Sequence, residues 1–204
     1  MPTVNVDPDE LMYGPQFAKE YVTTFLQNDI PTRINRYRNG WSLDDISLPA
    51  PATYVSFEPL ALDSWPTIIT VAISAKSFSR FYHEKTSDPV YNVTYAMRTY
   101  IWVRADGSEQ ATIMRDRLTT VVRSALLDRP CFARSSIRDA RVEESTLSEE
   151  YSDLTLLKGD RVMAGSYIGY DVVMEEVITR ETIAEFEDYE LVVNRSIIGA
   201  SLNV

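Results

Sequence analysis

The chain has 204 residues, 45% of them hydrophobic and 25% charged, which is enough to bury a core and typical of one globular domain. Its 30 acidic and 20 basic residues leave a net charge of −10. This balance argues against tight nucleic-acid binding, which needs a basic surface. The single cysteine excludes an internal disulfide. No run is apolar enough to predict a membrane span, and the first residues do not resemble a signal peptide.

The first predicted element is a helix over residues 14–28, where the apolar residues recur at helical spacing and Pro15 suits the first turn. Pro31 is predicted to open a short second helix. Its basic residues are interpreted as a solvated face rather than a binding patch: Arg33, Arg36 and Arg38. Residues 47–54 contain several turn-forming residues and predict a loop.

Two strands are predicted in the middle of the chain. Residues 67–75 are apolar on both faces, which favours a central strand. Residues 91–104 predict a long strand with one apolar face. Its other face carries Tyr100, Trp102 and Arg104, which is too aromatic for plain solvent surface. We therefore expect this second face to contact either a helix of the same chain or a neighbouring molecule.

The clearest predicted helix follows the turn at residues 105–109. Asp106 is predicted to cap it, and Glu109 lies three residues further on, as in a capping box. These two carboxylates would occupy the free backbone N–H groups and repel a phosphate. The order of strand, turn and helix is therefore interpreted as a structural joint and not as a phosphate site.

The acidic excess is confined to residues 143–190, which hold 14 acidic and 3 basic residues. This segment is either a solvated face or a surface that avoids polyanions. Residues 137–178 predict a long antiparallel β-hairpin with its turn at Gly159 and Asp160. We predict a single domain over residues 1–204, with a core in 12–142, the acidic hairpin region in 143–190 and a C-terminal arm in 191–204.

Motifs for catalysis or for a bound cofactor are not found. His83 and Cys131 are the only histidine and cysteine, so a metal site or a cysteine nucleophile is not expected. In "GSYIG" at residues 165–169 the serine is one place too early for a nucleophile elbow, and the flanking run reads as continuous strand. We expect no enzyme activity, no cofactor and no metal.

The order of elements, together with "TYAMRTYIWVRADGSEQATIMRDRL" at residues 94–118, resembles the tail terminator (tail-completion) proteins of long-tailed, non-contractile bacteriophages, especially those that infect actinobacteria. The resemblance covers roughly residues 12–142 and, more loosely, 160–180. It implies an α+β fold, with an antiparallel sheet, two or three helices on one face and the long C-terminal hairpin added. It also implies a homo-oligomeric ring, most simply a hexamer, in the virion at the head–tail junction.

In such a ring the chain would end growth of the tail tube and form the docking surface for the head connector or stopper protein. The ring would also contact the tape measure protein. Double-stranded DNA would pass through the lumen without specific binding, and no membrane would be involved. We take as candidate subunit or tube interface residues Tyr100, Trp102, Arg104, Phe81 and Tyr82. As candidate lumen residues we take Glu143, Glu144, Glu149, Glu150 and Asp153. Three alternatives stay open: another head–tail joining protein, such as a connector, stopper or minor tail protein, a cytosolic enzyme, and a small-molecule-binding module.

Overall fold

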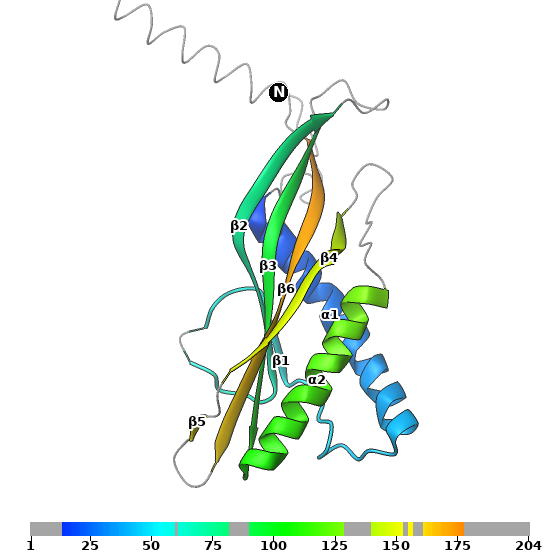
Figure 1. Cartoon of the computed structure of the whole chain (residues 1–204), viewed down its shortest axis with the longest axis vertical. Helices are drawn as coiled ribbons and strands as arrows, with labels where there is room; N and C mark the ends of the chain where they lie inside the picture. The colour runs from blue at the N-terminus through cyan, green and yellow to red at the C-terminus, as the bar shows by residue number, and fades with distance from the viewer. Residues whose placement is uncertain are drawn as a thin grey trace, which may run out of the picture.

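The computed structural model of the chain describes residues 14–59, 61–81, 90–128, 140–152, 155–156 and 161–177. Within these residues two helices pack on one face of a twisted sheet, which confirms the predicted α+β class (Figure 1). In chain order the elements are α1 (Pro15–Trp41), β1 (Thr53–Val55), β2 (Thr67–Phe81), β3 (Val90–Ala105), α2 (Ser108–Asp128), β4 (Ala140–Tyr151), β5 (Thr155–Leu156) and β6 (Val162–Val177).

The sheet has the strand order β1-β2-β3-β6-β4, and β5 also pairs with β6. All neighbours are antiparallel except β1 and β2, which are parallel, so the sheet is mixed and not antiparallel throughout as predicted. The parallel pair arises because the connection over residues 56–66 returns the chain to the end of the sheet at which β1 began. Since β1 covers β2 only from Thr67 to Ile69, β2 is a central strand at one end only.

The long strand β3 lies at the centre of the sheet, between β2 and β6, and pairs with β6 from Val90 to Ala105. Burial along most of β3 alternates with a period of two: Val93, Met97 and Ile101 are buried, whereas their neighbours are partly exposed. This alternation confirms a strand with one core face. Strands β2 and β3 also project beyond the helices at the top of Figure 1.

Residues 15–41 form one helix, so the prediction of a break before Pro31 is wrong. The apolar spacing runs straight through the proline, because Val22, Leu26, Ile30 and Ile34 follow one another at four-residue intervals and are all buried. Pro31 lies on the exposed side. Burial of this continuous stripe outweighs the lost backbone hydrogen bond.

Arg33 was predicted to be solvated, but it is 7% exposed. Its guanidinium pairs with Asp29 one helical turn earlier, and Nη2 lies 2.6 Å from Oδ2 of Asp128 at the end of α2. The arginine therefore ties the two helices together. Arg38 also has a structural partner, because its Nε donates a hydrogen bond to the Leu48 carbonyl at 2.9 Å.

Helix α2 begins one residue later than an Asp106 cap requires. The first intrahelical bond runs from the Ala111 N–H to the Gly107 carbonyl at 3.0 Å, which makes Gly107 the N-cap. The Asp106 side chain is 91% exposed, and its Oδ1 lies 3.9 Å from Nε of Arg161. Asp106 is therefore not the cap that the sequence predicted, although Glu109 does lie in the first turn.

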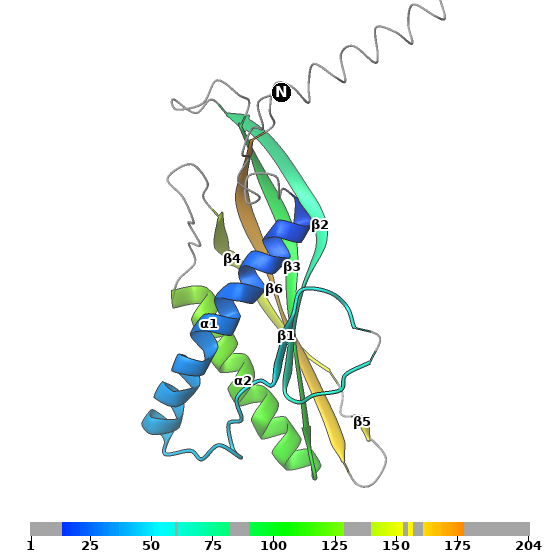
Figure 2. The same ribbon diagram turned by 180° about the vertical axis from the view of Figure 1, so that it is seen from behind.

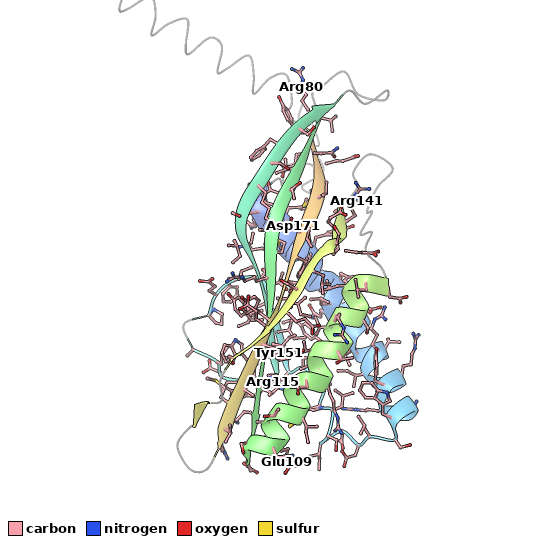
Figure 3. All side chains as sticks on the ribbon, viewed as in Figure 1. Arg80, Glu109, Arg115, Arg141, Tyr151 and Asp171 are labelled. Carbon is pink, nitrogen blue, oxygen red and sulfur yellow. The ribbon has the colours of Figure 1, made fainter. Side chains whose placement is uncertain are left out.

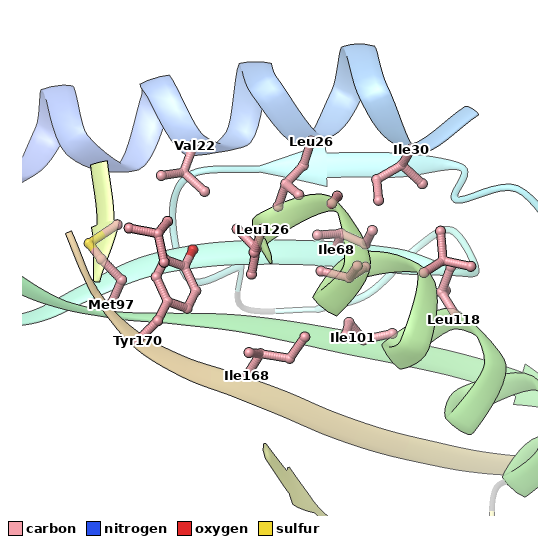
Figure 4. Packing of buried hydrophobic residues seen from close by; sticks show 14 of the residues in the cluster. Val22, Leu26, Ile30, Ile68, Met97, Ile101, Leu118, Leu126, Ile168 and Tyr170 are labelled. Carbon is pink, nitrogen blue, oxygen red and sulfur yellow. The ribbon is translucent and has the colours of Figure 1, made fainter. Parts of the chain in front are cut away.

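The core fills the space between the helices and the sheet (Figure 4). Its largest fully buried side chains include Leu26 from α1, Leu118 from α2, and Ile68, Ile101 and Ile168 from the strands. A few hydroxyl groups are buried with them and bond to one another. Thr99 Oγ1 lies 2.8 Å from the Tyr170 hydroxyl and 3.3 Å from Thr70 Oγ1. These pairings satisfy polar atoms that would otherwise be buried at a cost.

Strands β4 and β6 are antiparallel neighbours, but both belong to the main sheet, because β6 lies between β4 and β3. The register shifts between Glu143 and Ser148, which oppose Asp171 and Gly169. Residues 144–147 therefore bulge out of the ladder. The turn predicted at Gly159 and Asp160, and the predicted arm of residues 191–204, lie outside the described residues.

Candidate functional site

The face of the sheet opposite the helices is the candidate site, and we call it the open face. Both helices pack into the core on the other side, as seen by comparing Figures 1 and 2. No described helix covers the open face, so the expectation that a helix of the same chain covers it is not met within the described residues. On β3 the open face carries the polar and aromatic set predicted from the sequence: Tyr100, Trp102 and Arg104.

Trp102 lies flat against the neighbouring strand because Gly165 stands opposite it. A Cβ atom at Gly165 would come within 2.5 Å of Cζ3 of the indole, closer than any real contact. Ser152 holds the glycine backbone from the other side. Its Oγ donates to the Gly165 carbonyl at 2.9 Å, and the Gly165 N–H donates to the same Oγ at 3.1 Å. The glycine is therefore required by a side chain and not by a turn.

Two tyrosines and an arginine continue the row next to Trp102. Tyr100 and Tyr167 are register partners with ring centroids 5.4 Å apart and tilted by 55°. Arg98 places its Cζ 4.6 Å from the Tyr167 ring centroid, which is cation–π geometry. Glu150 opposes Tyr167 from β4, and its hydrogen bond raises the pKa of the Tyr167 phenol. These contacts hold the aromatic rings in place.

Charged groups border the aromatic row on both sides. Arg104 lies 5.5 Å from the ring centroid of Trp65, which precedes β2. Further along the face, Lys76 Nζ lies 2.7 Å from Oδ1 of Asp171, while the Asp171 N–H donates to Thr146 Oγ1 at 2.8 Å. The labelled Asp171 lies near the middle of the sheet in Figure 3. The open face thus combines fixed aromatic rings with charges of both signs.

The predicted acidic lumen residues do not form one surface. Glu143 and Glu150 oppose Asp171 and Tyr167, so they lie on the open face. Glu149 opposes the buried Ile168 and points toward α2, where both of its oxygens lie 3.2 Å from Nη1 of Arg123. Glu149 therefore lies apart from Glu143 and Glu150, on the helix side of the sheet. The exposed Glu144 follows Glu143 in the bulge.

Some predicted site residues lie outside the described residues. These are Tyr82, Asp153 and the side chain of Phe81, together with His83 and Cys131. On the helix side, Arg115 of α2 lies 4.9 Å from the Tyr151 ring centroid (Figure 3). This contact, with the Arg123 pair, fixes α2 to β4 and leaves the open face available.

Sequence reasoning missed Tyr167, Arg98 and Gly165 as members of the site. The strand pattern correctly assigned Tyr100 and Trp102 to one face, but only the register between β3 and β6 identifies what lies beside them. Gly165 gave a partial signal, because a glycine inside a strand indicates either a bulge or a close approach. The structure shows a close approach.

Chemically, the open face fits a protein contact better than a reaction. Tyrosine, tryptophan and arginine dominate the binding energy at protein interfaces.

Within the described residues no three histidine, cysteine, aspartate or glutamate side chains group as a metal site would require. No helix in the described ranges is long and apolar enough to cross a membrane. A scan against protein-family models found no match, and a search of curated proteins found no similar sequence.

Proposed function

We propose that the chain is a structural protein of a bacteriophage virion, a tail terminator that caps the head-proximal end of the tail tube. The cap ends polymerisation of the tube and presents the docking surface for the head connector. Identical chains form a closed ring, which we expect to be a hexamer, and the ring performs no catalysis. It takes this place at the head–tail junction after synthesis in the host cytoplasm.

The observation that carries the proposal is the open face. Its aromatic rings are held by Gly165, Tyr167 and Arg98, so little side-chain entropy is lost when a partner covers them. The contact between Trp102 and Gly165 also packs β3 against β6, so the ordered rings serve the fold as well as a contact surface. A subunit of a permanent assembly gains further, because ordered aromatic side chains supply large contact areas.

The acidic side chains suggest how DNA passes the ring. Glu143 and Glu150 share the open face with the aromatic row. If this face borders the lumen, these carboxylates repel the DNA backbone and prevent tight adhesion. The tape measure protein would occupy the same channel before the DNA does.

Electron microscopy of the full chain mixed with its tail tube protein tests the proposal. We expect rings at one end of each tube and tubes of limited length. Trp102→Ala should reduce end capping, whereas Trp41→Ala, at the exposed end of α1, should not. Binding to the head connector without binding to tubes would favour a connector or stopper protein instead. A monomer that binds neither the tail tube nor the head connector would refute a head–tail role and favour the enzyme alternative.

A further inference from the structure

Both edges of the sheet are without a strand partner in the described part of the chain. Strand β2 has 15 residues, and β1 covers only the first three, which leaves residues 70–81 as an open edge. At the other side of the sheet, β4 pairs with β6 along one edge only. The open stretch of β2 and the whole of β4 are each 12 residues long. Unpaired edges of this length are templates for another strand.

The two edges carry opposite charge. Along β4 lie one arginine and four glutamates. Glu149 pairs with Arg123 of α2, and the other three are Glu143, Glu144 and Glu150. The open stretch of β2 contains Lys76 and Arg80 and no acidic residue. Figure 3 shows Arg80 at the far tip of the sheet. Lys76 keeps half of its side chain exposed while it pairs with Asp171. A like-with-like pairing of edges would oppose equal charges, whereas β4 against β2 opposes unlike ones.

Strand direction favours the same combination. Successive antiparallel pairing from β2 through β3 and β6 makes β4 run opposite to β2. A second copy placed beside the first in the same orientation would therefore bring its β2 antiparallel to β4. The helices of both copies would then lie on one side of a continuous sheet, and both open faces on the other.

Irregular pairing at each edge limits indiscriminate association. Register shifts occur in β2 between Ala72 and Ser74 and between Ala75 and Ser77, and in β4 between Glu143 and Ser148. Bulges and charges are the devices by which proteins protect open edges. Only a pairing between edges of unlike charge, β4 with β2, then has an attraction that can offset this protection.

We infer that the chain self-associates head to tail, with residues 70–81 of one copy docked along β4 of the next copy. Such a heterologous contact closes into a ring when the rotation between copies closes. The inference deepens the proposed function, since it rests on the ring proposed there and names the surface that builds it.

Two charge-reversed variants of the full chain test the inference. One carries Glu143→Lys and Glu144→Lys, and the other carries Lys76→Glu and Arg80→Glu. In each variant alone both edges have the same sign, so self-association should weaken by roughly 100-fold or more. Mixed together, the two variants offer unlike edges at every contact and should form oligomers of alternating composition. Native mass spectrometry distinguishes these from oligomers of one variant.

The control variant reverses two exposed charges away from both edges, Arg36→Glu and Asp45→Lys, and should associate like the wild type. Circular dichroism checks that each variant is folded before mixing. Rescue on mixing supports the pairing, because two merely damaged proteins would not restore each other. A wild type that stays monomeric at millimolar concentration, or variants that associate alone, overturns it. Mixed rings that never cap tubes would refute only the tail role, and capped tubes without rescue on mixing would refute only this interface.

Discussion

Replacing Gly165 by alanine tests whether the close approach of Trp102 is a packing requirement. The added Cβ would lie 2.5, 2.7 and 2.8 Å from three ring carbons of the indole. Since carbon atoms pack best at about 3.5–4.0 Å, the ring must lift by about 1 Å. Such overpacking costs about 1–3 kcal/mol, offset by about 0.5–1 kcal/mol because the unfolded chain loses the freedom of glycine.

The net expectation for Gly165→Ala is a loss of up to about 2.5 kcal/mol in the free energy of unfolding, with about 1 kcal/mol near the middle of the range. For a chain of this size each kcal/mol lowers the melting temperature by about 2–4 °C, so about 1 kcal/mol corresponds to about 2–4 °C and the upper end of the range to about 5–10 °C. Urea unfolding followed by circular dichroism gives the free energy, and a thermal scan gives the temperature. Gly40→Ala in α1 is the matched control, because nothing lies within 4 Å of its Cβ position. That control should be neutral or slightly stabilising.

A double-mutant cycle separates the clash from any general effect on the strand. In a Trp102→Ala background the space above residue 165 is empty, so Gly165→Ala should be neutral or stabilising by about 0.5 kcal/mol. The reasoning is refuted if Gly165→Ala destabilises the chain equally in both backgrounds. In that case the glycine would be needed for its backbone and not for the tryptophan.

Three further predictions concern the core and its charges. Arg33→Met should lower the free energy of unfolding in urea by about 3–5 kcal/mol, because it leaves the Asp29 carboxylate, whose side chain is 15% exposed, without its cation. The control is Arg36→Met at an exposed position, which should change that free energy by less than about 0.5 kcal/mol. Leu118→Ala should cost about 2–5 kcal/mol by the same assay, since the side chain is fully buried, and a cost under about 1 kcal/mol would contradict its place in the core. Burial raises the pKa of the Tyr95 and Tyr170 phenols above the ordinary tyrosine value of 10.0. Above that pH the unfolded state loses protons that the folded state keeps, so stability should fall with rising pH, and a melting temperature unchanged through this range would contradict the burial.

Much of the fold was predictable because local patterns and burial agree. The alternation of β3 and the apolar spacing of α2 each follow from one face being in the core. The continuity of α1 was missed because Pro31 is a strong local signal, and only the buried stripe through Ile30 and Ile34 outweighs it. The Asp106 cap was missed by one residue, because glycine also occurs at N-caps and Gly107, directly after Asp106, takes that position.

The open face was predictable only in part. Periodicity assigns Tyr100 and Trp102 to the same side of a strand, but no pattern within one strand states which residue of another strand lies opposite. That information arises from the register between β3 and β6. The register places Tyr100 beside Tyr167, 67 positions later in the chain, and Trp102 beside Gly165, 63 positions later. The split of the acidic residues has the same origin. Neighbours such as Glu149 and Glu150 point to opposite faces once the strand forms.

The link between the start of α1 and the end of β6 has a consequence for how the chain folds. The Glu176 carboxylate accepts hydrogen bonds from the Gly14 N–H at 3.1 Å and from the Tyr95 hydroxyl at 2.6 Å. Gly14 and Glu176 are 162 positions apart. Contacts over such separations form only after shorter loops have closed, and folds that depend on them reach the native state slowly. We therefore expect this bond to form late in folding, and a probe near Gly14 would report when the sheet and the first helix have come together.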